Sequence, residues 1–183
     1  MKRLAIACLL TKSPASLQIL MTNYRRAKVT GGTYFITQVT YGRSPWLCED
    51  LPRQVLRQGI EAVRKDYPFA IDGFVLLPDH FHLLMTLPEG DTNFSERMRK
   101  IKGFVTRKIG HLPQFQTEPN LSREKRGEKY VWQRRFWEHL TRDEGDFHNH
   151  LQYIHNNPVK HQYCKNPEDW EYSSIHHHRK HSL

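Results

Sequence analysis

Two histidines flank a phenylalanine at the start of a segment with strong strand character. His80 and His82 open the run HFHLLMTL at residues 80–87. Side chains two apart in a strand point to the same face, so both imidazoles are expected to project together, with Phe81 on the opposite face. Two neighbouring imidazoles can act as a pair of metal ligands. Two strand histidines without a metal are the alternative that this pattern leaves open.

A tyrosine and an asparagine have a related spacing further along the chain. Tyr153 and Asn157 lie four residues apart in segment 143–157, which predicts a helix ended by Pro158. Asn157 can offer an amide oxygen to a metal while Tyr153 points at the same centre. Packing for Tyr153 and a helix-ending role for Asn157 remain the alternative. Two imidazoles and an amide oxygen favour Mg²⁺ or Mn²⁺, because no cysteine that zinc would prefer lies near either motif.

Basic residues are abundant and are interleaved with aromatic ones. The 183 residues carry a formal net charge of +9, which attracts phosphate backbones. Arg25 and Arg26 belong to the run YRRAK, Arg134 and Arg135 belong to WQRRFW, and Lys102 lies on a basic helix face. Such segments follow a nucleic-acid backbone and stack unpaired bases, so these five residues are the candidates for DNA binding. A solvated basic surface is the alternative.

Hydrophobic periodicity predicts one α+β domain. Strands are expected at 33–41, 69–77, 80–87 and 130–141, and helices at 53–66, 93–109 and 143–157, with a flexible basic loop at 111–129. This order matches a split βαβ, ferredoxin-like or RRM-like sandwich, with an antiparallel sheet covered by helices on one face. Trp132 and Trp137 differ by five positions, so they should face opposite sides of a strand, with at least one in the core.

The first 20 residues differ in character from the rest of the chain. Their short apolar run ends at Leu10 without a cleavage site for a secretion signal. We therefore expect residues 1–20 to be an upstream extension and the native protein to start at Met21, forming a single domain over 21–183 with a short C-terminal tail. Three widely spaced cysteines fit a reducing cytoplasm. No apolar run approaches the roughly 20 residues that span a bilayer, so no membrane partner is expected.

Several segments together resemble one family, the REP-associated tyrosine transposases, which are single-tyrosine transposases with a His-hydrophobic-His (HUH) motif. The resemblance runs from Tyr24 to Ser174 and does not cover residues 1–20. It is carried by these runs, in chain order: YRR at 24–26, GGTYF at 31–35, LPDHFH at 77–82, WQRRFWEH at 132–139, YIHNNPVKH at 153–161 and DWEYSS at 169–174.

The resemblance implies a role for each candidate residue. His80 and His82 match the paired metal-binding histidines, Tyr153 matches the nucleophile, and Asn157 matches the third ligand. It also implies cleavage and rejoining of single-stranded DNA at hairpins called repetitive extragenic palindromes (REP), through a 5′-phosphotyrosine. A monomer fits this branch better than the dimer of related insertion-sequence enzymes.

Two other functions remain to be distinguished at this point. One is a module that binds a DNA or RNA hairpin without cutting it. The other is a nuclease that uses water, with Tyr153 in a structural role only.

Overall fold

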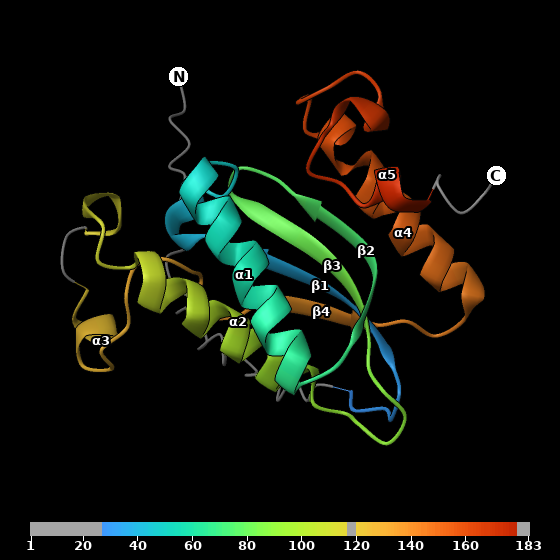
Figure 1. Ribbon diagram of the computed structural model, residues 1–183, viewed down its shortest axis with the longest axis horizontal. Helices are drawn as coiled ribbons and strands as arrows, with labels where there is room; N and C mark the ends of the chain where they lie inside the picture. The colour runs from blue at the N-terminus through green and yellow to red at the C-terminus, as the bar shows by residue number, and fades with distance from the viewer. Residues whose placement is uncertain (1–26, 117–119, 179–183) are drawn as a thin grey trace, which may run out of the picture.

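The computed structural model describes residues 27–116 and 120–178 (Figure 1). The main elements are β1 (Thr33–Val39), α1 (Asp50–Asp66), β2 (Ala70–Leu76), β3 (His80–Thr86), α2 (Phe94–Ile109), β4 (Trp137–Leu140) and α4 (Glu144–Lys160). Short helices connect or follow them: η1 (Tyr41–Arg43), η2 (Pro113–Phe115), α3 (Leu121–Glu124), η3 (Pro167–Asp169) and α5 (Ile175–His178). Arg25, Arg26, Met21 and the predicted 1–20 extension lie outside the described residues.

The four strands form one antiparallel sheet in the order β2-β3-β1-β4. With the order of the elements along the chain, this confirms the ferredoxin-like α+β fold. The central pairing of β1 with β3 places Thr37 opposite His82 and Val39 opposite His80. The two histidines therefore lie in the middle of the sheet, near the end where β1 leaves it.

Helices cover both faces of the sheet, so the expectation of a single covered face was wrong. The larger core lies under α1 and α2, where Leu56, Ile60, Met98 and Ile101 belong to the same buried cluster as Phe81 of β3. On the other face, Ile154 of α4 packs against a small second cluster, made of Phe35, Val75, Leu77 and Leu84. Figure 1 shows α4 well separated from the layer of α1 and α2.

A glycine in β2 lets α4 approach the sheet closely. A Cβ atom added at Gly73 would lie 2.8 Å from Cδ1 of Leu151 and 3.1 Å from Cδ1 of Ile154. A larger side chain at this position would have to displace the ends of these two α4 side chains. Because α4 carries Tyr153 and Asn157, this close contact sets how near they come to the histidines of β3.

The predicted strand 130–141 is mostly not a strand. Only residues 137–140 pair with β1, and Trp132 makes a single isolated bridge to Thr40. The reason is that side chains take the carbonyl groups of this segment. Lys102 Nζ donates to the carbonyls of Gln133 (2.7 Å) and Arg134 (3.0 Å), so these groups join no ladder.

Other boundaries moved for local reasons. Helix α4 continues through Pro158 to Lys160, although Pro158 was expected to end it. Helix α1 begins three residues before its predicted start, since Pro52 is tolerated in a first turn. The loop predicted as flexible contains η2 and α3, and the buried Arg123 fastens it by donating to the carbonyls of Lys129 and Trp132. Asn93 caps α2 by accepting a hydrogen bond from the Glu96 amide.

Among the described residues, no helix is long and apolar enough to cross a membrane.

Candidate active site

The two histidines of β3 lie side by side and are almost fully buried, with 4% of each exposed. Their ring centroids are 4.9 Å apart, as expected for residues on one strand face. Nδ1 of His82 lies 2.8 Å from the Thr37 hydroxyl on the neighbouring strand. The hydroxyl thus fixes the ring of His82 and leaves Nε2 as the nitrogen available to a ligand.

Asp79 orients the other histidine. Its carboxylate lies 2.6 Å from Nδ1 of His80 and also accepts a hydrogen bond from Arg43 at 2.9 Å. Burial acts to raise the pKa of Asp79, but the hydrogen bonds from His80 and Arg43 outweigh it and keep that pKa below its ordinary value. A carboxylate on one ring nitrogen presents the other to a metal, an arrangement common around metal-binding histidines.

Helix α4 brings Tyr153 and Asn157 to the same place. The Tyr153 ring lies 5.2 Å from the ring of His82 and 5.7 Å from that of Phe35. Asn157 is fully buried. Within the described part of the chain, neither polar atom of its amide has a hydrogen-bond partner, and the same is true of His82 Nε2. Buried polar atoms are rarely left in this state, so each needs an explanation.

A divalent metal bound by these groups would supply that explanation. Burial, followed by the charges of His80, His161 and Lys160, lowers the pKa of His82 to about 3, while the nearby Asn157 amide acts in the opposite direction. His82 is therefore neutral at physiological pH, the form that binds metals. Two imidazole nitrogens and an amide oxygen fit Mg²⁺ or Mn²⁺, with positions left for other oxygen ligands.

The two histidines and Tyr153 line a cavity of about 560 Å³, here called the catalytic pocket. Arg43, Lys160 and His161 bring basic groups to its wall, which suits a phosphate. Lys160 Nζ also lies 4.8 Å from the centroid of the Tyr153 ring. The lining includes, besides these residues, Phe35, Thr37, Val39, His80, His82, Trp137 and His150.

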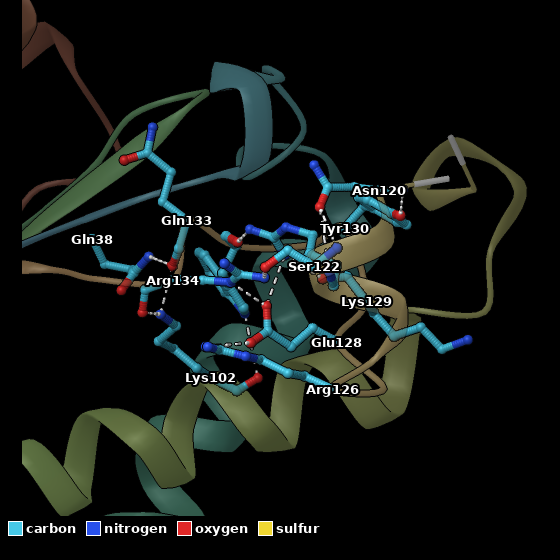
Figure 2. A network of polar contacts seen from close by, with 12 residues as sticks. Gln38, Lys102, Asn120, Ser122, Arg126, Glu128, Lys129, Tyr130, Gln133 and Arg134 are labelled. Atoms are coloured by element: carbon cyan, nitrogen blue, oxygen red, sulfur yellow. Dashed lines mark hydrogen bonds and ion pairs between the residues drawn. The ribbon is translucent and has the colours of Figure 1, made fainter. Parts of the chain in front are cut away.

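A second hollow, the cationic groove, lies between α2 and the segment after α3 (Figure 2). Its volume is about 570 Å³ and its lining contains seven basic residues: Lys102, Arg107, Arg123, Arg126, Lys129, Arg134 and Arg135. Glu128 lies among them and accepts a hydrogen bond from Arg134 at 2.6 Å. Because this single carboxylate stands against seven basic residues, the groove remains strongly positive.

The predicted DNA-binding residues differ in their surroundings. Arg135 is exposed on the groove. Arg134 is held by Glu128 and Ser122, and Lys102 is held by two carbonyls, so both also order the segment. Sequence reasoning missed Arg123, Arg126 and Lys129, whose signal was the dense basic run SREKRGEK at 122–129.

Segment 132–137 connects the cationic groove to the catalytic pocket. Trp132 lines the groove side and is buried, whereas Trp137 is 55% exposed and lines the pocket. The two tryptophans therefore face different surroundings, as expected. An exposed tryptophan that lines the same pocket as Tyr153 and follows a basic groove is a suitable stacking surface for an unpaired base.

Comparison with known proteins identifies the family of the chain. The family described as "Transposase IS200 like" matches residues 19–157. The chain belongs to this family. It is 44% identical over 156 residues to a putative REP-associated tyrosine transposase of Haemophilus influenzae, covering 85% of this chain and 86% of the relative. It is 40% identical to a REP-associated tyrosine transposase of Escherichia coli, covering 85% and 84%.

A solved structure is also similar over most of its length. It is described as a REP-associated tyrosine transposase bound to a REP hairpin, with a TM-score of 0.69 and 40% identity. The match covers 86% of this chain and 84% of that one. The resemblance expected from the sequence is thereby confirmed, and the chain is a single-strand DNA transposase of the tyrosine class.

Proposed function

We propose that this transposase cleaves and rejoins single-stranded DNA beside REP-type hairpins, with Tyr153 as nucleophile. His80, His82 and Asn157 would hold the divalent metal, Mg²⁺ or Mn²⁺. The observation that carries the proposal is the meeting in one pocket of Tyr153 and two buried histidines. The buried amide of Asn157, four residues along α4 from Tyr153, supports it, because that amide has no hydrogen-bond partner among the described residues.

The reaction follows from the chemistry of these groups. A metal held by His80, His82 and Asn157 would neutralise charge on the scissile phosphate and align it. The Tyr153 hydroxyl attacks phosphorus, forming a 5′-phosphotyrosine and releasing a 3′-hydroxyl. Attack of a 3′-hydroxyl on that linkage rejoins the strand. Since the phosphodiester energy is retained in the tyrosine ester, no ATP is needed.

The cationic groove would hold the hairpin, and Trp137 would guide its single strand into the catalytic pocket. The groove offers basic side chains to a phosphate backbone, which is where most of the affinity for nucleic acid arises. A hairpin also matches the ligand named for the similar solved structure. We further propose a cytoplasmic monomer whose domain spans residues 21–183.

Incubation with a hairpin bearing flanking single strands and Mg²⁺, followed by a denaturing gel, tests the proposal. A binding-only protein would shift the hairpin in a native gel without cutting it. A nuclease that uses water would cut without a covalent adduct. The catalytic pocket favours neither alternative, because neither one explains why Tyr153 lies beside the two histidines.

Arg135→Gln is expected to weaken hairpin binding more at low salt than at high salt. If its guanidinium contacts one phosphate, the slope of log K against log salt should fall by about 0.9. Fluorescence anisotropy at several salt concentrations measures this slope. Arg57→Gln is the matched control, since Arg57 is exposed on α1 outside the groove and pairs with Glu61. An unchanged slope in Arg135→Gln would remove this residue from the interface.

Asn157→Leu is expected to separate stability from activity. It removes two buried polar atoms that lack partners among the described residues, so the metal-free protein should gain about 1 kcal/mol of unfolding free energy. Cleavage should fall, because leucine cannot bind a metal. Asn157→Ala leaves room for a water and should slow cleavage only on the order of tenfold. Thermal unfolding and single-turnover assays measure both effects; destabilisation by Asn157→Leu would contradict a ligand role.

A further inference from the structure

A second group of polar side chains adjoins the catalytic pocket and includes none of the proposed metal ligands. Asp146, near the start of α4, connects two histidines. Its Oδ2 lies 2.7 Å from Nε2 of His139 on β4, and its Oδ1 lies 3.1 Å from Nδ1 of His150. The backbone carbonyl of Asp146 lies 2.8 Å from the same nitrogen of His150. The two imidazoles stack, with centroids 4.7 Å apart.

His150 is on the same face of α4 as the nucleophile. Positions 150, 153 and 157 follow the spacing of three and four residues that forms one helix stripe. His150 and Tyr153 both contact the ring of Phe35, with centroids 4.7 and 5.7 Å away, and both line the catalytic pocket. Because Nδ1 of His150 is engaged by Asp146, its Nε2 is the nitrogen available to the pocket.

The cluster is better suited to holding a proton than a metal. Its ligand atoms lie within 4.8 Å of one another, which would also allow a cation. However, Oδ2 of Asp146 already accepts hydrogen bonds from His139 and from the backbone and side chain of Arg142. A guanidinium on that oxygen opposes a divalent cation. An aspartate that fixes the tautomer of a histidine is the arrangement used to activate weak hydroxyl nucleophiles.

We propose that His150 accepts the phenolic proton of Tyr153 during strand cleavage, with Asp146 and His139 as positioning residues. This inference rests on the proposed function of Tyr153. As the bond between Tyr153 Oη and phosphorus forms, the Oη–H proton passes to Nε2 of His150. The bond between phosphorus and the 3′ oxygen breaks, and that oxygen leaves with its electron pair and takes a proton from solvent.

Rejoining reverses each transfer. The incoming 3′-hydroxyl gives its proton to solvent as it attacks phosphorus. The Tyr153 oxygen leaves with its electron pair and recovers its proton from the His150 imidazolium. Asp146 stabilises this imidazolium in the interval, so the same residue acts as base in cleavage and as acid in rejoining.

His150→Gln tests the proposal in the full-length protein. Single-turnover formation of the covalent adduct should slow by about 100-fold, the usual effect of removing a general base. Hairpin affinity, measured by anisotropy, should not change. His148→Gln is the matched control and should react like the parent protein. His148 makes the same bond to the carbonyl four residues earlier, Glu144, but is exposed and does not line the pocket.

A more acidic phenol distinguishes proton transfer from a structural role. With difluorotyrosine in place of Tyr153, the nucleophile ionises without a base, so the effect of His150→Gln should shrink to less than about tenfold. An equal loss with both phenols would overturn the inference, as would a normal rate in His150→Gln. So would tight binding of a second metal ion that requires His139.

The same assays distinguish an error in the proposed function of Tyr153 from an error in the role of His150. If the parent protein cuts without forming any adduct, Tyr153 is not the nucleophile and the inference falls with it. If the parent forms the adduct and His150→Gln forms it equally fast, only the role of His150 is wrong.

Discussion

Tyr153→Phe is expected to abolish the covalent protein–DNA adduct and strand cleavage. Loss of a nucleophile in other covalent enzymes lowers rates by many orders of magnitude, so a decrease of at least about 1,000-fold is expected. The ring contacts of Tyr153 with His82, Phe35 and Lys160 need no hydroxyl, and phenylalanine retains them. Folding and hairpin binding should therefore persist.

Denaturing gels with DNA labelled downstream of the cut measure this loss, and mass spectrometry locates the modified residue. Tyr163→Phe is the matched control. Tyr163 is exposed to a similar degree, 45% against 38%, and packs on His161 and Trp170 rather than on His82. A nucleotide attached to any residue other than Tyr153, or cutting by Tyr153→Phe, would contradict the assignment.

His80→Ala and His82→Ala should each prevent cleavage while leaving hairpin affinity nearly unchanged. Charge neutralisation by a bound metal is worth several kcal/mol at a reacting phosphate, which corresponds to at least about 1,000-fold in rate. Affinity should persist because, in the proposed binding mode, contacts between the cationic groove and the DNA backbone would supply most of it. Titration calorimetry with Mn²⁺ should show weakened metal binding in both variants.

A milder variant tests the same metal site through the residue that orients His80. Asp79→Asn retains the volume of Asp79 but weakens the orientation of His80, so a smaller loss of about 10- to 100-fold is expected. His148→Ala, outside the pocket, should cut normally. Normal cleavage by the double variant His80→Ala, His82→Ala would show that these histidines hold no catalytic metal.

Periodicity alone predicted which candidate residues share a face within one strand or one helix. It did not predict that the strand pair and the helix pair lie close together in the fold. An interval of two on a strand joined His80 to His82, and an interval of four on a helix joined Tyr153 to Asn157. Their meeting depends on α4 crossing the far face of the sheet, which Gly73 allows. Local pattern contains no information on which face a final helix covers, and the family resemblance supplied that link.

Other errors came from contacts between distant segments. Segment 130–136 has the aromatic and β-branched composition of a strand, but Lys102 and Gln38 bind its carbonyls through their side chains. Pro158 did not end α4, and it is buried there. The pairing of His139 with Asp146 joins β4 to α4 across a turn, so no spacing rule within one element could predict it.

The hydrophobic cores on the two faces of the sheet differ greatly in size, so the helices that cover them should not detach together when the domain unfolds locally. The hydrophobic cluster that packs α4 on the sheet is small, whereas α1 and α2 share the large core. Sub-global opening follows the smaller buried surface, so α4 should detach while the sheet and its histidines remain folded. The helix that would carry the covalently bound strand is thus expected to open before α1 and α2 do.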